Sequence, residues 1–131
     1  MAWEHRYFSS QEFACRCGCG AGERIEDIDM ELLNRLCTVR EQFGPMSVTS
    51  GARCPLHNKN EGGKPGSAHV TIPGERPCRA VDIRCTDSVQ RGKLLGLVYA
   101  HFKRVGVARS FIHMDVAGGP EYASPSTWLY S

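Results

Sequence analysis

Four side chains in the second half of the sequence are of types that could bind a metal ion and move a proton. His69 and Asp82 stand near the two ends of the stretch SAHVTIPGERPCRAVDI, and His113 and Asp115 lie two residues apart in FIHMDV. Two imidazoles and one carboxylate suit a catalytic zinc ion, because three protein ligands leave a fourth position for water. Zinc lowers the pKa of that water to about 7, and a second carboxylate nearby can take its proton.

The alternation of apolar and polar residues indicates which way these side chains point. Residues two apart in a strand share a face, so His113 and Asp115 point the same way, about 6.5–7 Å apart. Ile112 and Met114 then point the opposite way, toward a core. In RAVDIR the same alternation directs Asp82 away from its two apolar neighbours. Two strands therefore each offer metal-binding or acidic side chains on a face away from the core.

The elements before the second of these strands follow from periodicity and from turn residues. Apolar residues at steps of three and four predict a helix over 25–43, which ends at Gly44-Pro45. The segment 46–50 predicts a short strand. The segment 51–69 is rich in Gly, Pro and Asn and predicts a long loop, which in a compact domain is often functional. Residues 78–85 form the next predicted strand.

The last third of the chain predicts a helix, a strand and an aromatic tail. A capping-box pattern starts the helix at Asp87, and the helix runs to about Arg104 with Gly106 as its C-terminal cap. The segment 107–116 is a predicted strand, and the tail STWLY is expected to pack back onto the body. Short connections between these elements favour a single α+β domain with a small, mostly antiparallel sheet packed with helices.

Composition excludes several classes of protein. The chain has 131 residues, enough for one domain with its own core. Its net charge is only +2 and it has no long basic run, which argues against a nucleic-acid partner. No apolar stretch approaches the roughly 18–20 residues of a membrane span, so we expect no membrane insertion. The first residues lack the basic and apolar regions of a secretory signal, and we expect a cytosolic monomer.

Several motifs occur together and in a defined order. They are YFSSQEFACRCGCG at 7–20, VTSGARCPLHNKNEGGKPGSAH at 48–69, RAVDI at 79–83, FIHMDV at 111–116 and the closing TWLY. In this combination the chain resembles the zinc D-Ala-D-Ala carboxypeptidase family of peptidoglycan peptidases, which shares its fold with the hedgehog signalling domain. The version with CRCGCG is similar to sequences found in phage lysis genes and prophage regions.

The resemblance implies a fold, an activity and a location. The fold would be hedgehog-like α+β over residues 1–131, with the Cys-rich segment 1–20 packing on it. The activity would be zinc-dependent cleavage of peptidoglycan stem peptides, at either the D-Ala-D-Ala bond or an L-Ala-D-Glu bond. A phage endolysin of this kind is made in the host bacterial cytoplasm and acts at the periplasmic cell wall after release. Matched residue by residue, the ligands of its single catalytic zinc are His69, Asp82 and His113.

The resemblance also implies roles for three further residues. Arg53 matches an arginine expected to grip a substrate carboxylate, a task that suits the fork of a guanidinium. Ser67 precedes the first ligand and is expected to hydrogen-bond the substrate. Asp115 is the candidate for a catalytic carboxylate or for one that orients a ligand.

The chain departs from the family pattern at two places. Six residues usually separate the first histidine from the aspartate, whereas twelve separate His69 from Asp82. The longer spacer must loop out, which is tolerable because doubling a loop costs only about 0.6 kcal/mol. Its charged residues could contact substrate or face solvent. Many relatives also carry an acidic residue three positions before the last ligand, where this chain has Ser110. That difference supports an alternative, a catalytically silent zinc-holding domain that binds cell-wall peptides or a protein partner.

The seven cysteines allow more than one interpretation. An odd number argues against a fully paired disulfide framework. Cys15, Cys17 and Cys19 alternate with other residues, and Cys54 could complete with them a structural metal site, or pair with one of them in a disulfide. In either case the cysteines would tether the N-terminal segment to the Arg53 loop. A cysteine-zinc nucleic-acid module is a third hypothesis for function, disfavoured by the charge balance.

Overall fold

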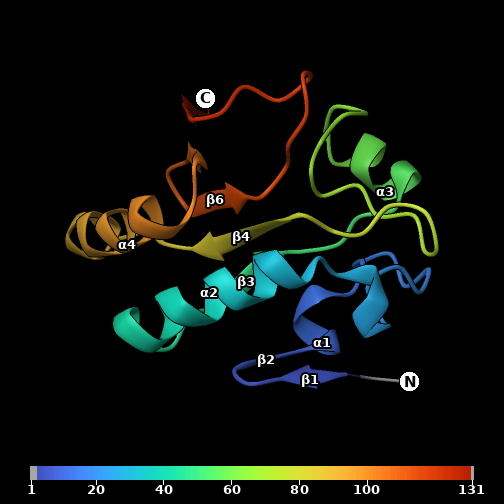
Figure 1. The fold of residues 1–131 in the computed structure, drawn as a ribbon, viewed down its shortest axis with the longest axis horizontal. Coiled ribbons are helices and arrows are strands. Elements are labelled where there is room, and N and C mark those ends of the chain that lie inside the picture. Colours follow the sequence, from blue (N-terminus) through green and yellow to red (C-terminus); the bar gives the residue numbers. More distant parts are fainter. Residues whose placement is uncertain (1–2, 131) are drawn as a thin grey trace.

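The computed structural model describes residues 3–130 and is built around a five-stranded sheet (Figure 1). The strand order is β3-β4-β6-β5-β7. All neighbours pair antiparallel except β5 and β7, which are parallel. The strands are β3 (Val48–Ser50), β4 (Ala80–Arg84), β5 (Arg104–Val107), β6 (Phe111–Asp115) and β7 (Ser126–Leu129). The small, mostly antiparallel sheet predicted from the sequence is confirmed.

Helices and a small hairpin complete the α+β fold. The two long helices, α2 and α4, pack against each other, and the short α3 lies beside the loop that precedes β4 (Figure 1). The helical elements are α1 (Ser10–Phe13), a 3-10 turn (Ile25–Asp27), α2 (Met30–Phe43), α3 (Pro55–Asn60) and α4 (Ser88–His101). A hairpin of β1 (Glu4–His5) and β2 (Phe8–Ser9) precedes them. Among residues 3–130, no helix is long and apolar enough to cross a membrane.

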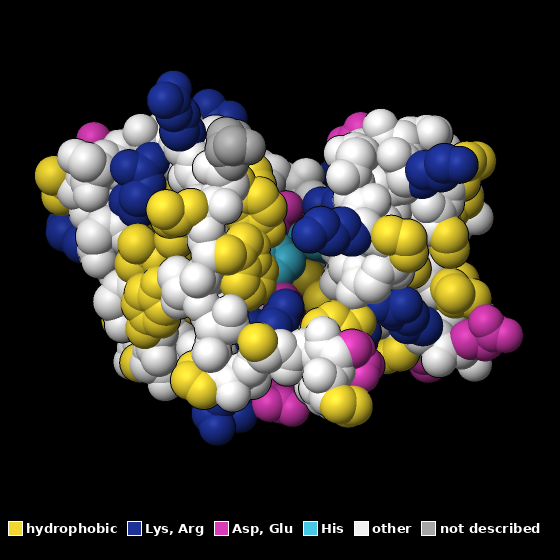
Figure 2. Space-filling view, turned by 90° about the horizontal axis from the view of Figure 1, so that it is seen from above, with side chains coloured by type: hydrophobic (Ala, Val, Ile, Leu, Met, Phe, Trp, Pro, Cys, Tyr) yellow, Lys and Arg dark blue, Asp and Glu magenta, His cyan; other side chains and the backbone are white. Residues whose placement is uncertain are grey.

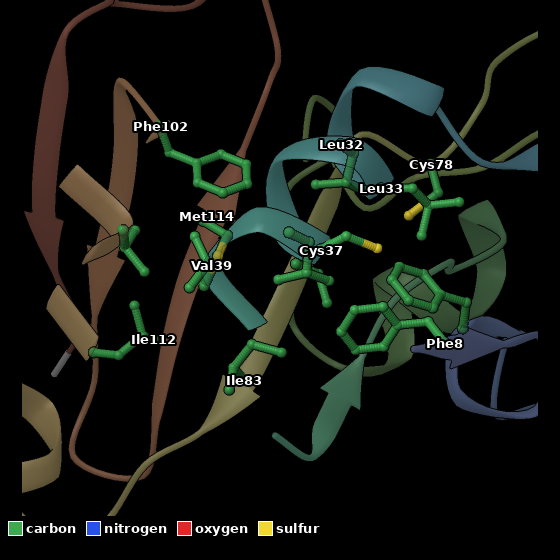
Figure 3. Close-up of a cluster of buried hydrophobic side chains, with 14 of the residues drawn as sticks. Phe8, Leu32, Leu33, Cys37, Val39, Cys78, Ile83, Phe102, Ile112 and Met114 are labelled. Carbon is green, nitrogen blue, oxygen red and sulfur yellow. The ribbon is translucent and has the colours of Figure 1, made fainter. Parts of the chain in front are cut away.

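The hydrophobic core lies between the two long helices and one face of the sheet (Figure 3). Leu32 and Val39 of α2 meet Ile83 of β4 and the β6 residues Ile112 and Met114, all fully or almost fully buried. The core therefore takes one face of β4 and β6 and leaves the polar side chains of these strands to the other face.

Helix α2 begins later than its apolar pattern predicts. The predicted start at residue 25 is wrong, since residues 25–27 form a separate 3-10 turn. The Asp29 carboxylate accepts hydrogen bonds from the amides of Glu31 and Leu32 and so caps α2. The amide of Asp29 donates to the carbonyl of Cys78 at 2.9 Å. This bond to the segment before β4 holds the chain extended just before the helix.

The end of α4 also differs from the prediction. The helix stops at His101, and Arg104, the residue expected to end it, is instead the first residue of β5. Gly106 is not a helix cap but lies within that strand, paired with His113. A Cβ atom at Gly106 would lie 2.6 Å from Nε1 of Trp128, so the glycine admits the indole ring against the strand. The predicted strand over 107–116 is likewise divided by a turn into the hairpin of β5 and β6.

The loops and the tail follow the predictions in outline. The long loop 51–69 contains one short helix, α3, whose N-cap is Cys54 and whose first residue is Pro55. The spacer before β4 loops out with only isolated bridges, among them that between Ile72 and Arg76. The aromatic tail packs back onto the body as β7, beside β5.

Candidate metal centre

Adjacent strands bring the predicted ligands together. Asp82 of β4 and His113 of β6 are register partners, and His69 reaches them from the end of the long loop. The Asp82 Oδ1 atom lies 3.1 Å from Nε2 of His69 and 2.9 Å from Nδ1 of His113. All three ligand atoms lie within 4.8 Å of one another, and all three residues are buried. The group could therefore hold one metal ion.

The hydrogen bonds of His69 indicate that a cation belongs in this group. Nδ1 of His69 lies 2.7 Å from the carbonyl oxygen of Gly51, which can only accept, so Nδ1 carries a proton. In a neutral imidazole Nε2 is then an acceptor that faces another acceptor, the Asp82 carboxylate. Such a pair needs a second proton or a metal ion between its members. Burial lowers the pKa of His69 and so opposes the second proton, which leaves a metal ion as the better fit.

The contact between the Gly51 carbonyl and His69 depends on the absence of a side chain at position 51. A Cβ atom at Gly51 would lie 2.9 Å from Cα of Phe13, so a larger residue would push the loop away from α1. Because the Gly51 carbonyl fixes the His69 ring, the close approach of α1 to the loop contributes to the geometry of the metal centre.

Asp115 holds His113 in place from the far side of the ring. Its Oδ2 lies 2.7 Å from Nε2 of His113. Its Oδ1 accepts hydrogen bonds from Nε of Arg104 at 2.7 Å and from the amide of Ala117 at 3.1 Å. The Asp115 residue is only 2% exposed, and both carboxylate oxygens are engaged. This is the arrangement of a carboxylate that orients a metal-binding histidine.

The charged states of the centre follow from burial and from these contacts. For His113, burial opposes the charged form, but the hydrogen bonds to Asp115 and Asp82 outweigh it and raise the pKa. For Asp82, burial favours the neutral form, but the two histidines outweigh it and lower the pKa. For Asp115, burial is again outweighed, here by His113 and then by Arg104, and the pKa is lowered. Both aspartates are therefore carboxylates near neutral pH.

The centre lies at the bottom of a cavity of about 690 Å³. In the space-filling view a histidine is visible at the base of a furrow, with Lys and Arg side chains beside it and a hydrophobic wall on one side (Figure 2). Trp128 is part of the lining, with its ring centroid 5.3 Å from that of His113. The other aromatic lining residues are Phe111, Tyr122 and Tyr130. Neither these aromatics nor Arg104 were predicted to belong to the site, although the aromatic tail was a signal for Trp128.

The two predicted substrate-binding residues both line the cavity. The Arg53 guanidinium donates to Oγ of Ser50 at 3.0 Å and to Oδ1 of Asn58 at 3.2 Å, and its NH2 lies 3.5 Å from Asp82 Oδ2. Arg53 is thus directed at the metal centre by neutral partners on either side. The Ser67 hydroxyl accepts a hydrogen bond from the amide of His69 at 3.2 Å.

The spacer between the first two ligands contributes to a wall beside the cavity. The Tyr122 hydroxyl lies 3.2 Å from NH2 of Arg76 and 2.9 Å from NH2 of Arg79. The guanidinium of Arg79 also lies over the Tyr122 ring, 5.0 Å from its centroid. Glu75, in contrast, is exposed. The spacer therefore places two arginines against a tyrosine of the cavity lining.

The remaining sequence-predicted residues lie elsewhere. Ser110 is exposed in the turn before β6 and is not among the cavity-lining residues. The four cysteines Cys15, Cys17, Cys19 and Cys54 lie together, with their sulfur atoms within 4.8 Å of one another. All seven cysteines are free thiols in this structure.

The family model for Peptidase M15 matches residues 6–115. The match covers most of the chain, including all three predicted ligands, so the chain belongs to the peptidase M15 family, whose members are zinc enzymes. A comparison with curated proteins gives no match. The fold class is the one expected for a peptidase of this family.

Proposed function

We propose that the protein is a zinc-dependent peptidase that cleaves peptidoglycan stem peptides. The observation that carries the proposal is the buried group of two histidines and one aspartate at the base of a cavity that also contains an arginine. Membership of the M15 family supports peptidase chemistry, and the resemblance to D-Ala-D-Ala carboxypeptidases supports the choice of substrate.

Three atoms would hold the zinc ion: Nε2 of His69, Oδ1 of Asp82 and Nδ1 of His113. When bound, zinc supplies a Lewis acid and lowers the pKa of a water molecule to about 7. The protein's own contribution is to fix the ligands. Gly51 holds one imidazole through its carbonyl, and Asp115 holds the other through its carboxylate. Two of the three ligands are therefore oriented by hydrogen bonds to groups of the protein itself.

Arg53 is the residue that we assign to binding a substrate carboxylate. Its side chain is only 16% exposed, and Ser50 and Asn58 fix the orientation of the guanidinium. A carboxylate bound at this point would place the neighbouring peptide bond close to the metal centre. Arginine suits the task because its planar group can donate two parallel hydrogen bonds.

Proton transfer needs an acid that can reach both the substrate and solvent. Asp115 is better suited to orienting His113, because it is buried and both of its oxygens are engaged. Glu121 is the other acid that lines the cavity, apart from the ligand Asp82. It is exposed, and no hydrogen bond or ion pair within residues 3–130 engages its carboxylate. We therefore assign proton transfer to Glu121 and positioning to Asp115.

The proposal includes a biological role in cell-wall lysis of the phage endolysin type. It rests on the resemblance of the Cys-rich N-terminal segment to sequences of phage lysis genes. In this role the protein would be made in the cytoplasm of the host bacterium and would meet the periplasmic wall after release.

One observation favours the alternative of a silent zinc-holding domain that binds wall peptides or a protein partner. The position three residues before His113, acidic in many relatives, is Ser110, and it lies outside the cavity. If Glu121 does not replace that acid, the centre would bind peptides without cleaving them.

Digestion of purified sacculi separates the two functions. Zinc-reconstituted protein is incubated with sacculi, and soluble fragments are identified by mass spectrometry, which also names the bond that is cut. A peptidase releases fragments shortened at one bond of the stem peptide, and Glu121→Gln releases them much more slowly while Glu121→Asp retains part of the rate. Zinc-loaded protein that pellets with sacculi but releases no fragments would show the silent domain instead.

A further inference from the structure

A second group of potential metal ligands lies outside the cavity, and it ranges from a buried cysteine, Cys15, to two exposed ones, Cys17 and Cys19. We call it the cysteine cluster: Cys15, Cys17, Cys19 and Cys54. Three members come from the N-terminal segment after α1, and Cys54 comes from the loop that carries Arg53. The sulfur of Cys17 lies 3.4 Å from that of Cys15 and 3.7 Å from that of Cys54.

We propose that the cysteine cluster binds a structural zinc ion, separate from the ion of the His/Asp/His centre. Structural zinc is bound tetrahedrally by four thiolates at about 2.3 Å, which sets neighbouring sulfurs about 3.8 Å apart. The two sulfur–sulfur distances above are close to this value. A disulfide needs a sulfur–sulfur distance of about 2.05 Å and joins only two of the four residues. Convergence of all four sulfurs is therefore better explained by a tetrathiolate site.

The backbone around the cluster is shaped for thiolates. The amide of Cys54 donates to the sulfur of Cys15 at 3.4 Å, and the amide of His57 donates to the sulfur of Cys54 at 3.3 Å. Such amide donors stabilise negative charge on sulfur, as the partners around a metal site commonly do. The chain between the cysteines turns at Gly18, where φ is +80°, a conformation that glycine adopts without strain. The turn lets three cysteines at alternate positions face one point.

The site has a structural consequence for the cavity. Cys54 directly follows Arg53, and the same loop begins at Gly51, whose carbonyl holds His69. The amide of Ala52 donates to the carbonyl of Phe13 at 2.8 Å, a second link between the N-terminal segment and the loop. Zinc bound by the cysteine cluster would thus fix the loop that aims Arg53. The site itself does not depend on the proposed peptidase function, because its ligands are not in the cavity.

Metal content and cobalt absorption test the inference. The protein is purified under reducing conditions, and zinc per chain is measured by elemental analysis. We expect two zinc ions per chain. Replacement with Co²⁺ should give the near-ultraviolet absorption of thiolate-to-cobalt charge transfer, which a His/Asp/His site cannot produce. The double variant Cys17→Ser/Cys19→Ser should bind one ion and lose this absorption. The matched control is Cys85→Ala, a cysteine outside the cluster, which should keep both ions and the absorption.

The reciprocal variant distinguishes the two sites. His113→Ala should bind one ion and keep the charge-transfer absorption, whatever its enzymatic activity. Wild-type protein with one zinc ion and no charge-transfer band would overturn the inference, even if the double variant failed to fold. A mass deficit of two hydrogens that peptide mapping assigns to a pair within the cluster, in protein kept reduced, would overturn it in favour of a disulfide. Neither result would bear on the peptidase proposal.

Discussion

The His/Asp/His centre and the cysteine cluster are two groups of metal-ligand side chains built in opposite ways. The first is buried, and two of its three ligands are register partners on adjacent strands whose other face packs into the core. The cysteine cluster takes three of its four ligands from a turn near the N-terminus, and Cys17 and Cys19 are exposed. The fold holds the ligands of the first group in place, whereas zinc bound by the cysteine cluster would help to stabilise the fold.

The difference indicates what each site can do. Zinc in a catalytic site has three protein ligands and an open position, and the site is shaped before the ion binds. Zinc in a structural site has four protein ligands, and its binding energy contributes to folding. Loss of the buried ion should therefore abolish chemistry with little effect on the fold. Loss of the surface ion should loosen the fold with less effect on chemistry.

Removing a ligand of the buried centre should have the largest effect on activity, and it tests whether the two sites differ in role. His113→Ala should lower the rate of stem-peptide cleavage by about 10³-fold or more, because the zinc-activated water is lost. The far-ultraviolet circular dichroism should stay that of the wild type, since the core face of β6 is unchanged. Rates are measured by release of a new amine from a defined stem peptide. A variant that retains most of the wild-type rate would show that the buried group is not the active site.

Removing the carboxylate that orients His113 should have the next largest effect on activity. Asp115→Asn should lower zinc affinity or activity by about 10–100-fold, as is typical for partners of metal-binding histidines. Asp115 contributes to the raised pKa of His113, so the variant should have a lower His113 pKa. In the metal-free protein the His113 ring should therefore lose its proton at a lower pH in the variant than in the wild type, which NMR titration of the imidazole measures. An unchanged His113 pKa in Asp115→Asn would show that Asp115 does not act on this ring.

Arg53→Lys tests whether Arg53 binds the carboxylate of the substrate. Lysine keeps the charge but loses the paired hydrogen bonds, so the KM for a stem peptide should rise by about tenfold, or about 1.4 kcal/mol. The kcat should change much less. The matched control is Arg91→Lys, at the start of α4 and away from the cavity. An unchanged KM in Arg53→Lys would remove this residue from substrate binding.

The smallest effect on chemistry should come from the cysteine cluster. Cys17→Ser/Cys19→Ser should lower Tm by at least about 4 °C, the shift that roughly 1 kcal/mol produces in a small domain. It should raise KM a few-fold through the Arg53 loop and leave kcat almost unchanged. Thermal unfolding and steady-state kinetics on the same preparation measure both. A loss of kcat as large as that of His113→Ala would show that the two sites do not divide the roles.

The sequence was most informative where a local pattern determines the geometry. The alternation in FIHMDV and RAVDI correctly placed His113 and Asp82 on the face opposite the core, since residues two apart must share a face. The long loop and the returning aromatic tail were also anticipated.

The sequence was least informative where the structure of a segment depends on contacts with residues far away in the chain. The start of α2 depends on a hydrogen bond from Asp29 to Cys78, almost 50 residues away. Gly106 matched a helix cap locally, but its role depends on the indole of Trp128, which arrives from β7. Arg104 was predicted to end a helix. It contacts Asp115 because β5 pairs with β6, a pairing that the local sequence does not reveal. The periodicity of a short segment does not predict contacts with residues far away in the sequence, and such contacts override local preferences.

A metal titration tests most directly whether the buried His/Asp/His centre carries out the peptide cleavage. Metal-free wild-type and Cys17→Ser/Cys19→Ser proteins are titrated with zinc while cleavage of a defined stem peptide is followed by mass spectrometry. We predict that the double variant reaches full kcat at one zinc ion per chain, and that His113→Ala stays inactive at any zinc concentration. Zinc-saturated wild-type protein that cleaves no stem peptide, or a His113→Ala variant as active as the wild type, would contradict a catalytic role for the buried centre.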